Sequence, residues 1–272
     1  MTTATAEAVP AGRAVPGPAK VFLAVLSRDL FVTTRRELGV FLCQVTVQPL
    51  FMLFVFVKVL GAMNYVGEDF VDVLLPGVIS LTGFVAAFQT VALPLIMEFG
   101  YTKEIEDRLL APIPLRLLAV EKMVMATLRG VFAALLMYPL GALVAGSAPW
   151  RAAGLPWLLL FLVLGSWAGG AIGLILGTAL PPQRVNIMFA LILTPLMFTG
   201  GIQYPWPSLD GMRWFQVVTA LNPMTYQSEG LRGALVPGVP HIPLGVCTGV
   251  LVAVGIALAA LGVRGFRRRA LD

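Results

Sequence analysis

The sequence predicts an all-α membrane protein with six transmembrane helices. Of its 272 residues, 58% are hydrophobic and only 12% are charged, and the mean hydropathy is +0.88. An ordinary soluble domain carries about 25% charged residues. Half of that charge cannot cover a water-facing surface of this size, so most of the chain is expected to lie in lipid.

Six apolar stretches are long enough to cross a hydrocarbon core of roughly 30 Å, which requires about 20 helical residues. Their expected ranges are 40–60, 70–97, 123–146, 154–180, 185–203 and 243–264. Pro94, near the end of the second stretch, predicts a kink there because proline removes a backbone hydrogen bond.

Two of the expected spans carry small residues one helical turn apart, a spacing that lets helix backbones approach closely. These residues are Gly165, Gly169, Gly173 and Gly177 in the fourth span, and Gly245, Gly249, Ala253 and Ala257 in the sixth. We expect both ladders to pack within one protomer. A larger residue at Gly173 should then damage folding rather than substrate choice.

The remaining segments complete the domain organisation. Residues 1–19 are rich in Ala, Pro, Thr and Gly and predict a disordered tail. Residues 20–38 place apolar side chains broadly on one helical face, which predicts an amphipathic helix in the membrane interface, with a cytosolic linker helix as the alternative. The transmembrane domain then covers residues 39–266, and residues 267–272 form a cytosolic basic tail.

The distribution of basic residues predicts the orientation in the membrane. With six spans, both termini lie on one side, and only four of the 19 Lys and Arg residues fall on the other: Lys58, Arg151, Arg213 and Arg232. The positive-inside rule therefore places both termini in the cytoplasm. It also accounts for the net charge of +5 without nucleic-acid binding. Lys58, at the outer end of the first span, can extend its side chain to the interface.

Two connecting segments are long enough to carry structure of their own. The cytosolic stretch 98–122 contains a short charged helix, about residues 101–110, which Pro112 and Pro114 end. Its charges fit either docking on a soluble partner or a solvated loop, and they belong to Lys103, Glu104, Glu106, Asp107 and Arg108. The external stretch 204–242 combines aromatic residues with prolines and predicts short re-entrant or interfacial helices.

No catalytic or metal-binding constellation is predicted. The chain lacks the G-x-x-x-x-G-K-[ST] phosphate cradle, the G-x-S-x-G elbow and the H-E-x-x-H zinc motif. His241 has no Cys or His neighbour with metal-ligand spacing, and Cys43 and Cys247 lie in apolar runs as small hydrophobes. No span carries a mid-membrane carboxylate of the kind that ion-coupled transporters usually keep. Energy for any transport is therefore expected to come from another polypeptide.

Polar side chains interrupt the first and fifth spans. Gln44 and Gln48 lie one turn apart in the first span with Phe51 about a further turn on, and Asn186 and Thr194 lie in the fifth. These residues could contact a substrate. The alternative is interhelical hydrogen bonding, which contributes about 0.6 kcal/mol per pair in a membrane protein.

Four segments carry a family resemblance. They are Phe70–Gly77, Glu98–Glu104 followed by Leu109–Pro114, Pro195–Gly201 followed by Tyr204 and Pro205, and Asn222–Tyr226 followed by Glu229, Leu231 and Arg232. In their order and spacing they resemble the transmembrane subunit of a type-2 ABC exporter, close to the daunorubicin/doxorubicin-resistance permease branch. The resemblance covers residues 20–264.

The resemblance implies a permease subunit that moves an amphipathic drug, natural product, lipid or glycolipid out across the cytoplasmic membrane. It implies a second permease copy or homologue and two copies of an ABC ATP-binding subunit, which bind ATP and Mg²⁺. This chain would then bind no cofactor and have no enzymatic activity of its own. A non-transporting membrane scaffold is the alternative, and a secondary transporter is disfavoured because no inverted repeat is evident.

The resemblance also assigns roles to residues. It implies a helix that couples to the ATPase at about Tyr101–Leu110, with Glu98 at the base of the second span. The external re-entrant helices correspond to residues 205–235, with a signature made of Asn222, Pro223, Tyr226, Glu229 and Arg232. The first and fifth spans would line the dimer interface and the substrate route. The candidate residues of this route are then Gln44, Gln48, Phe51, Asn186 and Thr194.

Overall fold

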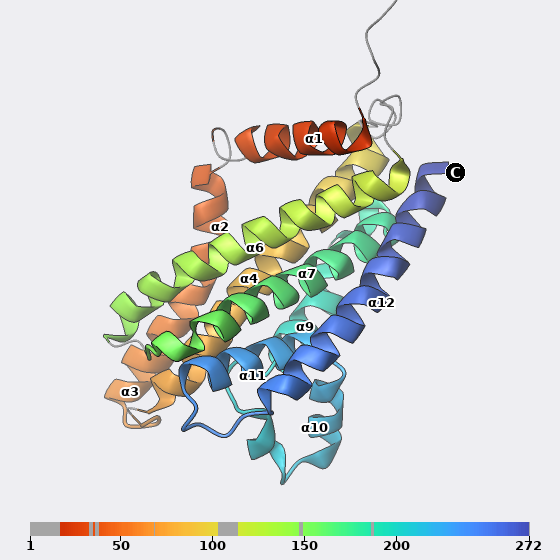
Figure 1. Cartoon of the computed structure of the whole chain (residues 1–272). Helices are drawn as coiled ribbons and strands as arrows, with labels where there is room; N and C mark the ends of the chain where they lie inside the picture. The colour runs from red at the N-terminus through yellow and green to blue at the C-terminus, as the bar shows by residue number, and fades with distance from the viewer. Residues whose placement is uncertain are drawn as a thin grey trace, which may run out of the picture.

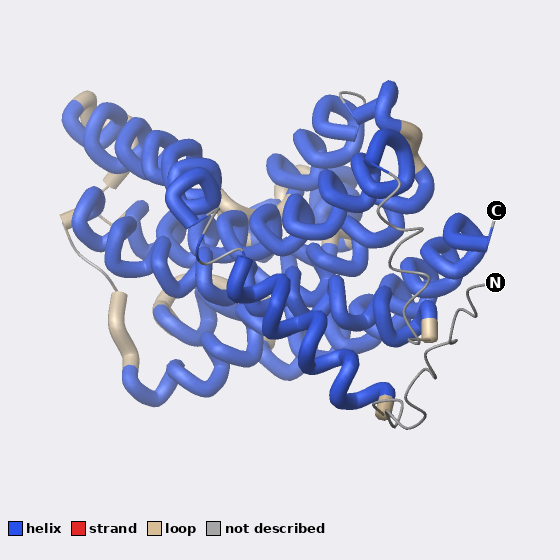
Figure 2. Tube along the Cα trace, turned by 90° about the horizontal axis from the view of Figure 1, so that it is seen from above, coloured by secondary structure: helices blue, strands red, loops and turns tan. Residues whose placement is uncertain are grey.

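The computed structural model describes residues 17–32, 35, 38–67, 69–102, 114–146, 149–185 and 188–271. Every regular element within these ranges is helical (Figure 2). Five helical stretches are long and apolar enough to span a membrane: Leu38–Ala62, Phe70–Gly100, Leu115–Ala145, Ala152–Ala179 and Leu244–Leu271. They correspond to five of the six expected spans.

The expected span 185–203 is not among these five. Its described part is a π-helix, η6 (Met188–Leu193), followed by α9 (Thr194–Thr199). The apolar helix Ala190–Thr199 is shorter than the other spans. Pro195 lies in the first turn of α9, directly after the π-helix ends. Because proline has no backbone N–H, it cannot donate the hydrogen bond that would continue the π-helix. The sixth span stays a prediction.

Helix α4 (Phe70–Met97) is the central helix of the bundle. Every residue from Leu74 to Phe84 is buried, as expected for a helix that is apolar on all sides. It packs against α6 (Leu115–Ala145) and α7 (Leu155–Ala179), and α12 (Leu244–Leu271) packs on α7 (Figure 1). Helix α4 runs through Pro94 and passes into a π-helix, η3 (Glu98–Thr102).

The first span is built from three consecutive elements. They are α2 (Leu38–Leu53), the π-helix η2 (Phe54–Val59) and the short α3 (Leu60–Ala62). Helix α2 packs on α4 and α6 at the edge of the bundle. It presents much of its apolar surface outward, including Val40, Val47 and Phe51.

Helix α1 (Pro18–Val32) lies across the end of the bundle where α12 also ends (Figure 1). It contacts α6 and leaves the apolar side chains of Leu23 and Phe31 exposed beside the exposed Arg28. An exposed apolar surface next to a basic side chain suits the membrane interface. The helix covers most of the expected range 20–38, and its interfacial role stays a prediction.

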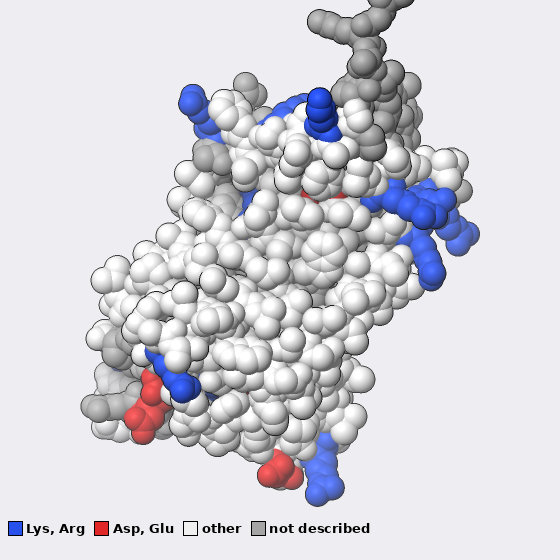
Figure 3. Space-filling view, viewed as in Figure 1, with Lys and Arg blue, Asp and Glu red and all other residues white. Residues whose placement is uncertain are grey.

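Charged side chains gather at the two ends of the molecule. On the face drawn in Figure 3, Lys and Arg crowd the end that carries α1 and the C-terminus, and a broad band without charge crosses the middle. A charge-free band of this kind matches a hydrocarbon layer. At the end that carries α1, helix α12 continues to Leu271. Most of the expected basic tail is therefore the last turn of α12.

The glycine ladder of α7 packs within the protomer. A Cβ at Gly169 would lie 2.5 Å from the carbonyl oxygen of Phe84, and one at Gly173 would lie 2.5 Å from that of Phe88. Both distances are far below ordinary contact, so glycine is what allows α7 to lie against the backbone of α4. Gly165, at the start of the same ladder, faces Gln227 of helix α11 (Pro223–Leu235) instead.

The expected ladder of α12 does not pack in the same way. Gly245 and Gly249 have no neighbouring atom within 4 Å of a built Cβ. Helix α12 approaches α7 farther along, where Gly255 faces Trp167 and Gly262 faces Leu174. The position of the contact depends on the large side chains of α7, which the small-residue spacing of α12 does not reveal.

We predict that Gly173→Leu prevents correct folding, because the new side chain would overlap the Phe88 backbone. Overpacking of this kind costs about 1–3 kcal/mol or more. The yield of monodisperse protein in detergent should fall several-fold, measured by size-exclusion chromatography. Gly249→Leu, which introduces the same side chain where space is open, should leave the yield unchanged. Equal yields for the two variants would contradict the assigned packing.

Candidate functional site

The end of the bundle opposite α1 is closed by short helices. They are η7 (Trp206–Leu209), α10 (Arg213–Ala220) and α11 (Pro223–Leu235) (Figure 1). Short helices are what the sequence predicts for the stretch 204–242. Helix α11 packs against α4, α7 and α12 and is buried along nearly its whole length.

Asn222 fixes the start of α11. Its side-chain oxygen accepts a hydrogen bond from the Met224 amide at 2.9 Å, the standard contact of a helix N-cap. Its side-chain nitrogen donates to the Leu196 carbonyl at 2.6 Å and to the Thr199 hydroxyl at 2.9 Å, which ties α11 to α9. Pro223 occupies the first helical turn, where its missing amide hydrogen has no cost.

Glu229 and Arg232 form an ion pair inside the protein, and neither side chain is exposed to solvent. The Glu229 carboxylate also accepts backbone hydrogen bonds from Trp206 and Ile242, each at 3.0 Å. Arg232 donates to the carbonyl oxygens of Val73 at 3.1 Å and Gly201 at 2.9 Å. The pair therefore joins α11 to α4, to η7, to the loop after α9 and to the segment before α12.

The charge of Glu229 depends on these partners. Helix α11 lies outside the five apolar spans, and burial raises the pKa of the Glu229 carboxyl, while Arg232 and the two backbone amides act to lower it. Tyr226, the remaining signature residue, donates its hydroxyl to the Ala220 carbonyl at 2.9 Å and so holds α10 against α11. The hydrogen bonds of Asn222, Tyr226 and Arg232 thus run to neighbouring segments of the same chain and fix α11 in place.

A polar groove lies between α2, α4 and α9. Gln44 of α2 donates to the Gln89 side-chain oxygen of α4 at 2.8 Å. Gln48, Gln89 and Met197 line a cavity of about 30 Å³ beside this bond, which is room for about one water molecule. The other lining residues include Val45, Pro49, Thr82 and Val85, so the wall is mostly apolar, with side-chain amides from both α2 and α4.

The structure brings together only part of the predicted path. Gln44 and Gln48 share the groove, whereas Phe51 is 68% exposed and does not line it. Thr194 begins α9 but is not a lining residue, and Asn186 lies outside the described residues. The sequence reasoning did not select Gln89, although it is the one side-chain amide in the apolar stretch 70–97.

At the end nearer α1, Glu98 and Lys122 form a second buried ion pair, with 2.9 Å between nitrogen and oxygen. It links the end of α4 to the first part of α6. The sequence reasoning selected Glu98 but not its partner. Tyr101 belongs to η3, and the other predicted coupling residues lie outside the described residues: Lys103, Glu104, Glu106, Asp107 and Arg108.

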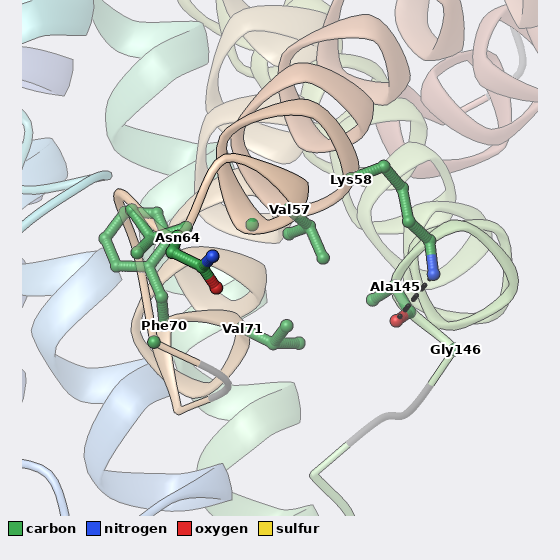
Figure 4. Close-up of a pocket in the computed structure, with 10 residues that line it drawn as sticks. Val57, Lys58, Asn64, Phe70, Val71, Ala145 and Gly146 are labelled. Atoms are coloured by element: carbon green, nitrogen blue, oxygen red, sulfur yellow. Dashed lines mark hydrogen bonds between the residues drawn. The ribbon is translucent and has the colours of Figure 1, made fainter.

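The opposite end has a cavity of about 540 Å³ between η2, α4 and α6 (Figure 4). Lys58 reaches across it, and its ammonium lies 3.5 Å from the Ala145 carbonyl oxygen, where α6 ends. Gly146 then leaves the helix with a positive φ of 83°. A cation at a helix C-terminus is favoured by the helix dipole. Lys58 thus extends toward the end of the span, as the sequence predicts.

This arrangement of apolar helices and short closing helices defines a multi-pass membrane protein. The ABC-2 type transporter family model matches residues 21–236, and the chain belongs to this family. It is similar to the inner membrane transport permease YadH of Escherichia coli strain K12, with 26% identity over 194 residues, 70% of this chain and 72% of YadH. The YadH proteins of E. coli O157:H7 and Shigella flexneri give the same values. No solved structure matches.

We predict that Arg232→Met lowers the thermal stability strongly, because it leaves the Glu229 carboxylate buried without its counter-ion. Breaking a buried pair in this way costs about 3–5 kcal/mol. Thermal unfolding in detergent should show a drop in Tm of several degrees. Arg213→Met is the matched control, since Arg213 is exposed and its loss should have little effect. Equal Tm values for Arg232→Met and Arg213→Met would show that the ion pair does not anchor α11.

Proposed function

We propose that this chain is the permease subunit of an ATP-driven exporter that moves an amphipathic substrate out across the cytoplasmic membrane. The observation that carries the proposal is the polar groove of Gln44, Gln48 and Gln89 in a chain of the ABC-2 type transporter family. Placing a polar side chain within an apolar span costs free energy, so such residues are rare and often mark a functional site. A mixed wall of amides and apolar side chains suits the chemistry of a drug, a natural product, a lipid or a glycolipid. Because the cavity has room for only about one water molecule, such a substrate would enter only after α2 moves away from α4.

The elements around the groove support a substrate route. Two of the helices that line the groove adjoin six-residue π-helices in the chain: η2 follows α2, and η6 precedes α9. Such helices are rare and occur frequently at functional sites. In the proposed exporter, the outward surfaces of α2 and α9, which include Phe51 and Phe198, would face a second permease copy. We place the chain near the daunorubicin/doxorubicin-resistance branch and both termini in the cytoplasm.

The energy would come from two separate ATP-binding subunits, which hold ATP and Mg²⁺. The charged segment of about residues 101–110 would dock on them through Glu104, Asp107 and their neighbours. Glu98 and Lys122, which flank this segment in the sequence, are locked together by the buried ion pair. A displacement of the docked segment would therefore act on α4 and α6 as a unit.

We predict that the chain co-purifies with its ATP-binding subunit and that Glu104→Lys with Asp107→Lys lowers coupled ATPase activity about tenfold. The physical reason is lost charge complementarity at the docking surface. Pull-down and ATPase assays in nanodiscs measure the effect. Asp210→Lys, at the opposite end, is the control. Failure of the unmodified pair to associate would favour a non-transporting scaffold, whereas an unchanged double variant would remove only the docking assignment.

We also predict that Gln44→Leu with Gln89→Leu lowers transport several-fold without dissociating the complex, because the groove loses its hydrogen-bonding groups. The measurement is ATP-dependent accumulation of doxorubicin, as a fluorescent amphipathic probe, in inside-out vesicles. Val47→Leu alters an exposed position on the same helix and should leave transport intact. Equal rates for the two variants would place the route elsewhere.

A further inference from the structure

A third cavity, separate from the groove and from the Lys58 cavity, lies between α7 and α12. Its volume is about 330 Å³. Ile175 and Ala179, one helical turn apart, line it from the last turns of α7. Leu261, Gly265 and Arg268 line it from α12 at a spacing of four and three residues, which puts them on one helix face. The cavity thus has an apolar part and a basic part.

The basic part is formed by arginines at the C-terminal end of α12. Arg268 and Arg269 line the cavity, and Arg264 and Arg267 lie on neighbouring positions of the same turns. Helix α12 contains no acidic residue, and within the described ranges no carboxylate forms an ion pair with any of these four arginines. Arg269 lies over the ring of Phe99 at 6.0 Å, which holds its guanidinium near the bundle surface.

The apolar part is open because small residues line it. A Cβ at Gly265 would lie 3.1 Å from the Thr178 hydroxyl oxygen, so α7 and α12 nearly touch there and close the cavity floor. Leu261, which is 54% exposed, lies seven residues before Arg268. This separation corresponds to about 10 Å along a helix, close to the distance from a phospholipid phosphate to the upper part of its acyl chains.

We propose that this cavity binds an anionic phospholipid, with its phosphate on Arg268 and Arg269 and an acyl chain along Ile175, Ala179 and Leu261. Guanidinium groups bind phosphate through paired hydrogen bonds. Basic pockets between transmembrane helices are suited to lipid headgroups. An acidic soluble protein would use the arginines but would have no use for an apolar slot between two spans, so the combination favours a lipid.

The test measures binding of phosphatidylglycerol to the purified full-length chain in detergent by native mass spectrometry, with phosphatidylcholine as the neutral comparison. Arg268→Gln with Arg269→Gln should weaken phosphatidylglycerol binding about thirtyfold, the factor expected for two basic residues at a membrane surface. The control, Arg264→Gln with Arg267→Gln, removes the same charge beside the cavity and should change binding less than threefold. Inorganic phosphate at the same concentration should not compete.

A third variant, Ala179→Leu, keeps every charge but fills the apolar part, and should also weaken phosphatidylglycerol binding. Because Ala179 is exposed, this variant tests the site even if the arginine variant fails to fold. Equal binding of the two lipids, equal losses in the two arginine variants, competition by free phosphate, or unaffected binding in Ala179→Leu would each overturn the proposal. So would loss of the ATP-binding subunit, with lipid binding unchanged, when Arg268 and Arg269 are replaced.

Discussion

The buried ion pair of Glu229 and Arg232 is the constraint on which the end of this molecule opposite α1 depends. Two charges away from water carry a desolvation penalty of several kcal/mol each, which is offset only when hydrogen bonds surround them. Their partners come from α4, from the loop after α9, from the start of η7 and from the segment before α12. Arg232 alone reaches a residue 159 positions away in the sequence. Helix α11 cannot shift without breaking contacts to all of these segments.

The interior around this pair is closely packed, and the periphery is not. Helix α11 lies against α4, α7 and α12, and α7 approaches α4 until glycines touch backbone. By contrast, α2 and α9 turn large apolar side chains outward, among them Phe51 and Phe198. The Gln44–Gln89 hydrogen bond joins one peripheral helix to the central one. The polar groove therefore lies at the boundary between the closely packed core and the peripheral helices α2 and α9.

The sequence predicts the helical class and five of the spans well, because long apolar runs have few alternatives in lipid. It is less informative where irregular backbone replaces a full helix, as in the stretch 185–203 around Pro195. The sequence also does not reveal which residues far apart in the chain contact each other. Nothing in the sequence pairs Gln89 with Gln44, or Lys122 with Glu98, because each pair joins two helices whose residues lie 24 or more positions apart in the chain. Small-residue spacing located the packing face of α7 correctly but misplaced that of α12, because the partner side chains decide where two helices meet.

These features together suggest how work done at one end of the molecule could reach the other. Helix α4 has 28 residues, which corresponds to about 42 Å of helix, and it is buried for most of that length. Its C-terminal end is held to α6 by Glu98 and Lys122, and its N-terminal end is held to α11 through Val73 and Arg232. A helix fixed at both ends inside a packed core transmits displacement rather than absorbing it. If ATP-binding subunits move the end that carries Glu98, we expect the displacement to reach the boundary between α2 and α4, where Gln44 and Gln89 meet.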